Sequence, residues 1–318
     1  DNMIIVTGGA GFIGSNLIWG LNQIGIEDIL VVDNLSQADK HRNLNSLKIA
    51  DFLDKEDFLA ELPKLENVQT IFHQGACSDT MEWNAEYLFQ NNLLYSKELL
   101  EFCLGCSTPL IYASSASVYG SGNNFKEELE NESPINLYAY SKYLFDQIVR
   151  KHLGSNKSQI VGLRYFNVYG PRQSLANVYT QIVPKWIRSI AKGEDITIYG
   201  DGSQTMDMIF STDVAKSNLA ACDNDECRNI FINIGTSVQT SVKELLDIML
   251  VEMGKLVPNI KSEITYDSHD PNLVKKRCCD NKLMVKYLGK PQTDLQQGIA
   301  ETCAAIYDRM HRNEVHND

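Results

Sequence analysis

The 318-residue sequence predicts an α/β fold, in which a doubly wound parallel sheet is joined to a smaller C-terminal α/β lobe. Three observations lead to this prediction. Short and almost wholly apolar runs alternate with helical patterns in the first half, which is typical of a parallel sheet covered on both faces. A glycine-rich loop follows the first of these runs. After about residue 170 the apolar runs shorten and the loops lengthen, which indicates a second, smaller unit.

Each element is predicted from its hydrophobic pattern. In the first half, apolar runs predict buried strands at Met3–Val6, Ile29–Val32, Thr70–Phe72, Leu110–Tyr112 and Ile160–Leu163. Periods near 3.6 residues predict helices near 56–61, 85–104 and 138–152. In the second half, strands are expected at Ile196–Tyr199, Ile230–Ile234 and Ile264–Tyr266, with helices at 179–191 and 241–253.

Charge and composition exclude several classes of protein. The sequence holds 29 Lys and Arg against 41 Asp and Glu, a net charge of −12, so a broad nucleic-acid-binding face is not expected. No apolar run reaches the length of a membrane span, and no leader is visible before the first strand. We therefore expect a cytoplasmic protein without a membrane partner. Of the eight cysteines only Cys103 and Cys106 have C-x-x-C spacing, and no second pair completes a zinc site. The six histidines lack ligand spacing, so no metal site is expected.

The glycine-rich loop lies between the first strand and an amphipathic helix. Gly8 allows a sharp exit from the strand, Gly11 lets the backbone approach a pyrophosphate, and Gly14 lets the helix pack closely on the sheet. About twenty residues later a carboxylate ends the second strand, where it can accept hydrogen bonds from a ribose hydroxyl. The pattern predicts a Rossmann-type dinucleotide site that contains Gly8, Gly11, Phe12, Ile13, Gly14, Asp33 and Asn34.

This site sets the domain assignment and the choice of cofactor. We assign an NAD(P)-binding domain to residues 1–175 and a smaller substrate-binding lobe to 176–318, and expect the two to exchange segments. Asp33 indicates NAD rather than NADP, because a carboxylate repels a 2′-phosphate. Lys40 lies near enough in the sequence to meet such a phosphate, so NADP stays possible. Asp51, with Phe52 beside it, either meets the adenine edge or is a solvated surface residue.

A tyrosine and a lysine four residues apart lie in the helix predicted at 138–152. This spacing places Tyr138 and Lys142 on one face, and Ser115 follows the fourth strand, at the edge where such sheets bind ligands. A phenol titrates near 10, but an ammonium and a cationic nicotinamide nearby lower its pKa. Tyr138 can then accept a proton from an alcohol while hydride leaves its carbon, and Ser115 can hold the same oxygen. Tyr140 has no lysine at the same spacing.

With these motifs the chain resembles nucleotide-sugar epimerases of the extended short-chain dehydrogenase/reductase superfamily over essentially its whole length. The resemblance implies that Tyr138 is the catalytic base, Lys142 its partner and Ser115 the third member of the set. It implies that the cofactor is also contacted by Gln74, Gly75, Ala76, Asn92, Tyr138, Lys142, Phe166 and Val168. It implies that the substrate, a nucleotide-diphosphate sugar, is contacted by Ser78, Ser115, Asn167 and Arg277, the last as a clamp on the diphosphate.

The two halves of the chain resemble different members of that superfamily. The first half is similar to ADP-glyceromanno-heptose 6-epimerase, for example in Phe72–Ser78 and Ser158–Gly170. That family has a lysine as second catalytic base after its Pro-Arg, whereas Gln173–Asn177 contains none, and Met206 replaces a basic residue. The second half, for example Gly193–Gly202, is similar to UDP-hexose 4-epimerases. We therefore expect NAD(P)-dependent epimerisation, by removal and return of hydride, at C4 of a UDP-hexose.

Three alternatives stay open. The first is ADP-glyceromanno-heptose 6-epimerase activity. The second is a sugar 4,6-dehydratase, which is disfavoured because such enzymes need a carboxylate pair where this sequence has Ala116-Ser117. The third is a non-catalytic cofactor-binding protein, which is disfavoured because the catalytic set Ser115, Tyr138 and Lys142 is intact.

The apolar surface of the helices at 85–104 and 138–152 predicts a homodimer, although burial within one chain explains it equally well. The resemblance implies a place in carbohydrate metabolism, in cell-surface polysaccharide biosynthesis.

Overall fold

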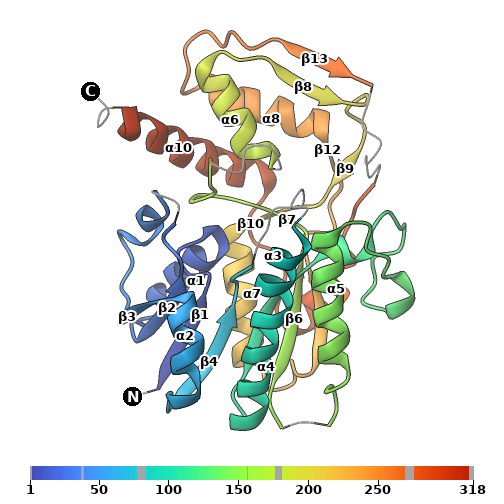
Figure 1. Ribbon diagram of the computed structural model, residues 1–318. Helices are drawn as coiled ribbons and strands as arrows, with labels where there is room; N and C mark the ends of the chain where they lie inside the picture. Colours follow the sequence, from blue (N-terminus) through green and yellow to red (C-terminus); the bar gives the residue numbers. More distant parts are fainter. Residues whose placement is uncertain are drawn as a thin grey trace.

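The computed structural model describes residues 2–36, 39–76, 84–155, 157–175, 181–268 and 276–314. They form a larger lobe around a parallel sheet and a smaller lobe made mainly of helices, which lies over one end of that sheet (Figure 1). The expected α/β fold class is confirmed. None of the described helices has the length and apolar character that crossing a membrane requires.

The larger lobe holds most of the strands. They are β1 (Met3–Thr7), β2 (Ile29–Asp33), β3 (Asp51–Asp54), β4 (Val68–His73), β5 (Leu110–Ser115), β6 (Ile160–Tyr165) and β11 (Ile230–Ile234). Its helices are α1 (Phe12–Gln23), α2 (Lys55–Glu61), α3 (Ala85–Phe89), the π-helical segment η3 (Gln90–Leu94), α4 (Tyr95–Cys106), α5 (Leu137–Arg150), α7 (Ser211–Asp223) and α9 (Lys282–Tyr287). Short 3-10 helices are η1 (Lys40–Leu44), η2 (Leu62–Lys64), η4 (Ala116–Tyr119) and η5 (Leu129–Asn131).

Within the described residues the main sheet has seven parallel strands in the order β11-β6-β5-β4-β1-β2-β3. From β1 the chain builds outward first through β2 and β3 and then, on the other side, through β4, β5 and β6. The boundary between β1 and β4 is therefore the topological switch point, outside which open α/β sheets bind ligands.

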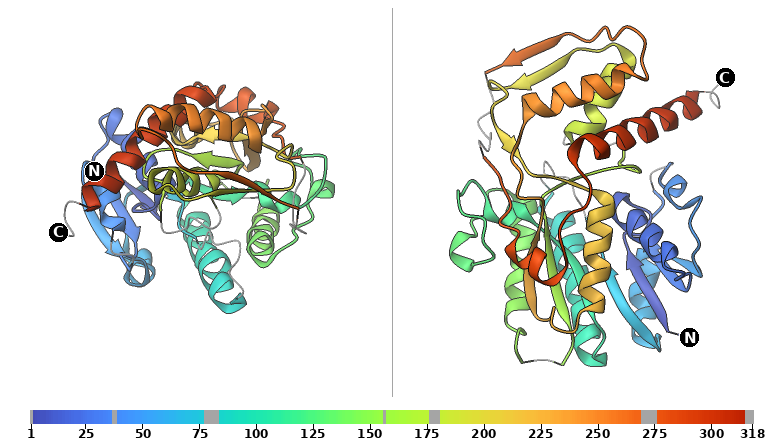
Figure 2. Two further views of the ribbon diagram at one scale, coloured as in Figure 1. Left: turned by 90° about the horizontal axis from the view of Figure 1, so that it is seen from above. Right: turned by 180° about the vertical axis from the view of Figure 1, so that it is seen from behind.

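The sheet has a hydrophobic core on each face, because successive side chains of a strand point to opposite sides. Ile4 and Val6 of β1 pack with apolar residues of α1 and α7, whereas Ile5, between them, packs with α2, α4 and α5. The helices that cover the two faces are visible in Figures 1 and 2. Both faces of these strands are covered by packed apolar side chains, which explains why the strands appear in the sequence as continuous apolar runs.

The smaller lobe has its own core. It contains α6 (Ile182–Lys192), α8 (Val242–Gly254), α10 (Leu295–Glu314) and the parallel pair β8 (Ile196–Tyr199) and β13 (Ile264–Asp267). Trp186, Leu245 and Ile299, one from each helix, are buried together there. Two further strand pairs connect the lobes: β7 (Asn167–Tyr169) with β10 (Met208–Phe210), and β9 (Thr205–Met206) with β12 (Thr240–Ser241).

Every strand predicted from an apolar run lies within a strand of the structure. The pattern missed β3, the short strands β7, β9, β10 and β12, and the helices α7, α9 and α10. The α7 helix was missed because the face that it buries contains Ser211, Asp213 and Asn218, so it shows no clear apolar stripe. The domain boundary at residue 175 stays a prediction, and the sheet itself takes in residues on both sides of it, since β11 pairs with β6.

Candidate active site

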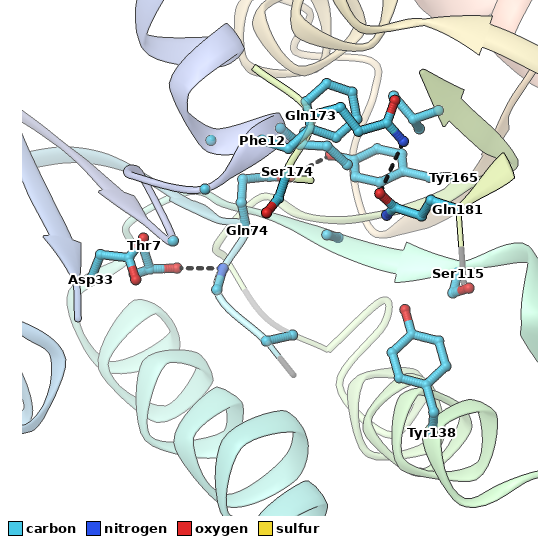
Figure 3. Close-up of a pocket in the computed structure, with 18 of the residues that line it drawn as sticks. Thr7, Phe12, Asp33, Gln74, Ser115, Tyr138, Tyr165, Gln173, Ser174 and Gln181 are labelled. Atoms are coloured by element: carbon cyan, nitrogen blue, oxygen red, sulfur yellow. Dashed lines mark hydrogen bonds between the residues drawn. The ribbon is translucent and has the colours of Figure 1, made fainter. Parts of the chain in front are cut away.

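A cavity of about 730 Å³ lies at the carboxyl ends of the parallel strands and extends to the smaller lobe (Figure 3). It is lined by the ends of β1, β2, β4, β5 and β6, by the residues that follow them, and by α5. The smaller lobe contributes Gln181, Ile182 and Val183 at the start of α6 and Arg309 of α10. Segments far apart in the sequence thus meet at the place where doubly wound sheets bind ligands.

The glycine-rich loop is packed too tightly for any other residue. Gly8 has a φ of +65°, and a Cβ there would lie 2.6 Å from the Cα of Gly75. A Cβ on Gly14 would lie 2.1 Å from the carbonyl oxygen of Gly8. Helix α1 begins after Gly11 without a side-chain cap, and its first residues line the cavity. The close backbone approach and the uncapped helix N-terminus suit the pyrophosphate of a dinucleotide.

Asp33 ends β2 and is buried beside this loop. Its Oδ2 accepts a hydrogen bond from the N–H of Ala10 at 3.0 Å, and its Oδ1 accepts from the N–H of Asn34 at 2.7 Å. The Lys40 ammonium lies 2.6 Å from the same Oδ1 and pairs with the carboxylate. The structure therefore places a carboxylate and a cation side by side at one end of the cavity.

Ser115, Tyr138 and Lys142 share another wall of the cavity. The Oγ of Ser115 accepts hydrogen bonds from the N–H of Ser117 at 3.1 Å and from its hydroxyl at 2.7 Å, so the Ser115 O–H can itself donate into the cavity. The Tyr138 phenol extends from α5 into the cavity on the side of Ser115 (Figure 3). Lys142, one turn further along α5, is buried and donates to the carbonyl of Ala113 at 2.9 Å.

The surroundings of Tyr138 favour a negative charge on its oxygen. The tyrosine lies in the first turn of α5, whose N-cap, Asn136, accepts from the N–H of Ala139 at 2.8 Å. The positive end of a helix dipole stabilises anions there, and the buried Lys142 ammonium on the same helix face adds a full positive charge. This arrangement suits a phenolate that takes up and releases a proton.

A buried histidine lies behind this wall and takes no charge at neutral pH. Burial, followed by the positive charge of Lys142, lowers the pKa of His73 to about 3. Its ring nitrogens lie 2.6 Å from the Thr7 hydroxyl and 2.7 Å from the Ser96 hydroxyl. The N–H of Gly75 also donates to the Thr7 hydroxyl. These hydrogen bonds of Thr7 with His73 and Gly75 hold the ends of β1 and β4 together under the cavity.

The wall nearest the smaller lobe carries the residues expected to contact nicotinamide and substrate. Phe166, Asn167 and Val168 line the cavity. Arg277 lines it as well: one of its Nη atoms donates to the carbonyl of Gly120 at 3.1 Å, while its buried Nε has no hydrogen-bond partner within the described part of the chain. Burial lowers the pKa of Arg277. A buried guanidinium with an unused donor is suited to an anionic group.

Most of the predicted site residues line this one cavity, and three of those that the structure describes do not. Asp51 and Phe52 begin β3, and about 3.3 Å of rise per residue puts them far from its carboxyl end. Asn92 is buried in η3 and donates to the Ser141 hydroxyl at 3.1 Å instead of lining the cavity. Ser78 lies outside the described residues. The predicted contacts of these four residues stay predictions.

The cavity also contains residues that the sequence reading missed. Lys55 follows the carboxyl end of β3 and bonds the side chain of Asn91. The side chains of Gln173 and Gln181 are hydrogen-bonded at 3.0 Å across the cavity wall (Figure 3). Arg309 reaches Asn43 from α10 at 2.9 Å. A search of each strand end could have found Lys55, whereas Arg309 and Asn43 are 266 residues apart and have no local signal.

Comparison with known proteins agrees with this site. Residues 4–235 match the NAD dependent epimerase/dehydratase family. The chain is 48% identical over 252 residues to an ADP-L-glycero-D-manno-heptose-6-epimerase from Brachyspira hyodysenteriae, covering 76% of this chain and 79% of that protein. Its structure resembles a UDP-N-acetylglucosamine 4-epimerase from Methanobrevibacter ruminantium, with a TM-score of 0.86, 29% identity and coverage of 98% and 99%.

A second solved structure is similar to the same extent. It is a UDP-glucose 4-epimerase from Thermotoga maritima with UDP-glucose, at a TM-score of 0.84 and 28% identity, covering 96% of this chain and 99% of that one. The resemblance to nucleotide-sugar epimerases of the extended short-chain dehydrogenase/reductase type is thereby confirmed. The chain belongs to the NAD dependent epimerase/dehydratase family.

Proposed function

We propose that this protein interconverts two UDP-hexoses that differ at C4, with NAD as its bound cofactor. One observation carries the choice of carbon. Where the heptose enzymes have a lysine as second base, this sequence has none between Gln173 and Pro184, and the cavity there is lined by the neutral side chains of Gln173, Ser174 and Gln181. A single base, Tyr138, then has to serve both faces of the reacting carbon.

The cofactor end of the cavity fits NAD. The glycine-rich loop and the uncapped start of α1 suit its pyrophosphate, and the carboxylate of Asp33 suits the adenosine ribose. When bound, NAD would supply a reversible acceptor for the hydride of the sugar carbon, so that no net oxidation would result. The Lys40 ammonium beside Asp33 also gives a 2′-phosphate a partner, so that NADP is the second choice.

The chain's own residues carry the proton steps. The Ser115 O–H donates to the oxygen on the reacting carbon and fixes its position. Tyr138 removes the proton of that hydroxyl and later returns it, while Lys142 and the start of α5 keep the phenolate stable. Arg277 and Asn167 hold the nucleotide diphosphate, and the sugar turns about this anchor to present its second face.

A second candidate is ADP-glyceromanno-heptose 6-epimerase activity. The 48% identity to a protein of that name favours it. It requires a second base at a position that the sequence does not fill with lysine, and this absence favours the first proposal. The product of either reaction would be a building block for cell-surface polysaccharides.

The test is an assay of the purified protein, with the cofactor that it retains, on UDP-glucose, UDP-N-acetylglucosamine and ADP-glyceromanno-heptose. We expect NMR to detect the C4 epimer of a UDP-hexose, with no NADH accumulating. Conversion of the ADP-heptose alone would replace the first proposal by the second. NADH formed in step with substrate consumption would contradict both and indicate a dehydrogenase.

We also propose that the protein is a homodimer formed through the outer faces of α3, α4 and α5. Leu94 and Tyr140 are 46% and 42% exposed, which is unusual for large apolar side chains on neighbouring helices. The rings of Phe89 and Tyr140 meet edge to face at 6.4 Å and connect α3 with α5 into one surface. A monomer mass by light scattering at micromolar concentration would rule this out.

A further inference from the structure

A buried network of charged side chains lies directly behind the candidate catalytic residues. Arg164 of β6 is fully buried, and its Nη2 lies 2.9 Å from Oε1 of Glu132 and 3.0 Å from Oδ2 of Asp146. The other carboxylate oxygen of Glu132 pairs with Arg150. Two guanidinium groups thus balance two carboxylates. Such a cluster is not by itself more stable than apolar side chains of the same volume, so its place in the fold needs another reason.

One carboxylate of the network joins the two elements that carry the catalytic set. Asp146 lies on α5 one turn after Lys142, and its Oδ2 accepts from the hydroxyl of Ser114 at 2.8 Å. Its Oδ1 accepts from the hydroxyl of Tyr112 at 2.7 Å. Ser114 and Tyr112 are both on β5, and Ser114 directly precedes Ser115. The docking of α5 on the end of β5 therefore depends on Asp146.

The network continues to the candidate phosphate contact. Arg164 donates from Nη1 to the hydroxyl of Tyr119 at 3.1 Å, and that hydroxyl donates to Asn233 at 2.6 Å. Asn233 in turn donates to the carbonyl of Asp280 at 3.1 Å. Arg277 is connected to the network through the chain neighbour of Tyr119, because it donates a hydrogen bond to the carbonyl of Gly120. One buried network thus connects the catalytic helix with the segment that carries Arg277.

We propose that Asp146 and Arg164 are positioning residues, which set the placement of Tyr138 and Lys142 relative to Ser115. The inference rests on the proposed roles of these three residues. Hydrogen bonds and ion pairs are directional, so the network defines the docking of α5 on β5 more narrowly than apolar packing does. Narrow docking matters here because a misplacement of about 1 Å near reacting groups can cost on the order of 10²-fold in rate.

Two matched variants separate positioning from support of the fold. Ser114→Ala and Tyr112→Phe each remove one buried hydroxyl that donates to Asp146, and neither leaves a charge unpaired. Only Ser114 is adjacent to the catalytic serine. We expect Ser114→Ala to lower kcat by about 10-fold or more with little change in KM. We expect Tyr112→Phe to leave kcat close to wild type, even if it lowers Tm by as much as Ser114→Ala does. Equal losses of kcat that follow the losses in Tm would overturn the proposal.

A second readout requires no substrate. The Tyr138 phenolate can be titrated in the NAD-bound protein from tyrosinate absorbance, as the difference between each variant and the same variant with Tyr138→Phe. We expect the midpoint of the Tyr138 titration to differ from wild type in Ser114→Ala and in the isosteric Asp146→Asn. In Tyr112→Phe we expect the wild-type midpoint. Unmoved midpoints in both of the first two variants would overturn the proposal. A moved midpoint in a protein that converts no nucleotide sugar would support the positioning role and refute the proposed function alone.

Discussion

The two ends of the cavity are built in different ways. At the cofactor end the contacts come from the residues that follow β1, β2 and β4, which reach the same edge of one sheet. At the substrate end they come from separate segments: Asn167 of β7, Gln181 before α6, Met206 of β9 and Arg277. In a parallel sheet the carboxyl ends of all strands lie at one edge, so the residue that follows each strand can be placed from the sequence. The connections between the lobes follow no such rule. The first kind of site can therefore be predicted from local motifs, whereas Asn167 and Arg277 of the second kind were predicted only from the family resemblance.

The largest effect is expected at the junction of the two ends. Tyr138→Phe removes the group that moves the proton, and we expect it to lower kcat by about 10²–10⁴-fold while the cofactor stays bound. Tyr140→Phe is the matched control on the same helix, because Tyr140 is 42% exposed and has no lysine four residues later. Steady-state kinetics of both variants check this. Near wild-type turnover by Tyr138→Phe would refute the assignment of the base.

The cofactor end can be broken by a single methyl group. Gly14→Ala would place a Cβ 2.1 Å from the Gly8 carbonyl, so we expect loss of retained cofactor and a lower Tm. Gly20→Ala, on the same helix, meets only ordinary contacts at 3.6 Å and is expected to stabilise α1 by up to about 1 kcal/mol. Thermal melting and the absorbance of cofactor in the purified protein check both. A Gly14→Ala variant that keeps its cofactor would contradict the tight fit of the loop.

The substrate end depends on fewer charged contacts, so the expected loss there is smaller. A hydrogen bond to a charged group contributes about 1.5–3 kcal/mol, which corresponds to about 10- to 10²-fold in affinity. We expect Arg277→Gln to raise KM in this range with a much smaller change in kcat. Lys276→Gln, at the exposed neighbouring residue, is the control. If the two variants raise KM equally, Arg277 does not bind the diphosphate.

The last prediction concerns the pH dependence of stability at the cofactor end. The pKa of His73 is lowered to about 3 in the folded protein by burial and by Lys142, so between that value and about 6.5 the unfolded chain binds more protons. Stability from this site is thus complete above about pH 6.5 and is lost as the pH falls, by up to about 1.4 kcal/mol per pH unit. Urea unfolding at several pH values should give a shallower dependence for His73→Gln than for the same change at the exposed His41. Equal pH dependences of the unfolding free energy in the two variants would contradict the assignment of this effect to His73.

Local chemistry in the sequence determined the parallel sheet, the glycine-rich loop and the pairing of Tyr138 with Lys142. Apolar runs identify strands that are buried on both faces, and a four-residue spacing identifies one face of a helix. The same local rules did not predict β3, because a strand that is not apolar throughout gives no sign of where it begins. In the structure β3 runs from Asp51 to Asp54, so its carboxyl end brings Lys55 to the cavity.

Only the tertiary structure decided which distant groups became partners. The contact of Arg309 with Asn43 and the buried cluster around Arg164 each join segments whose meeting depends on how whole elements pack. The physical reason is that burial of apolar surface is not directional and follows composition, while hydrogen bonds and ion pairs require particular atoms at particular distances. The sequence alone therefore predicts the reaction chemistry of the site, and the packing of the lobes sets what that site can hold.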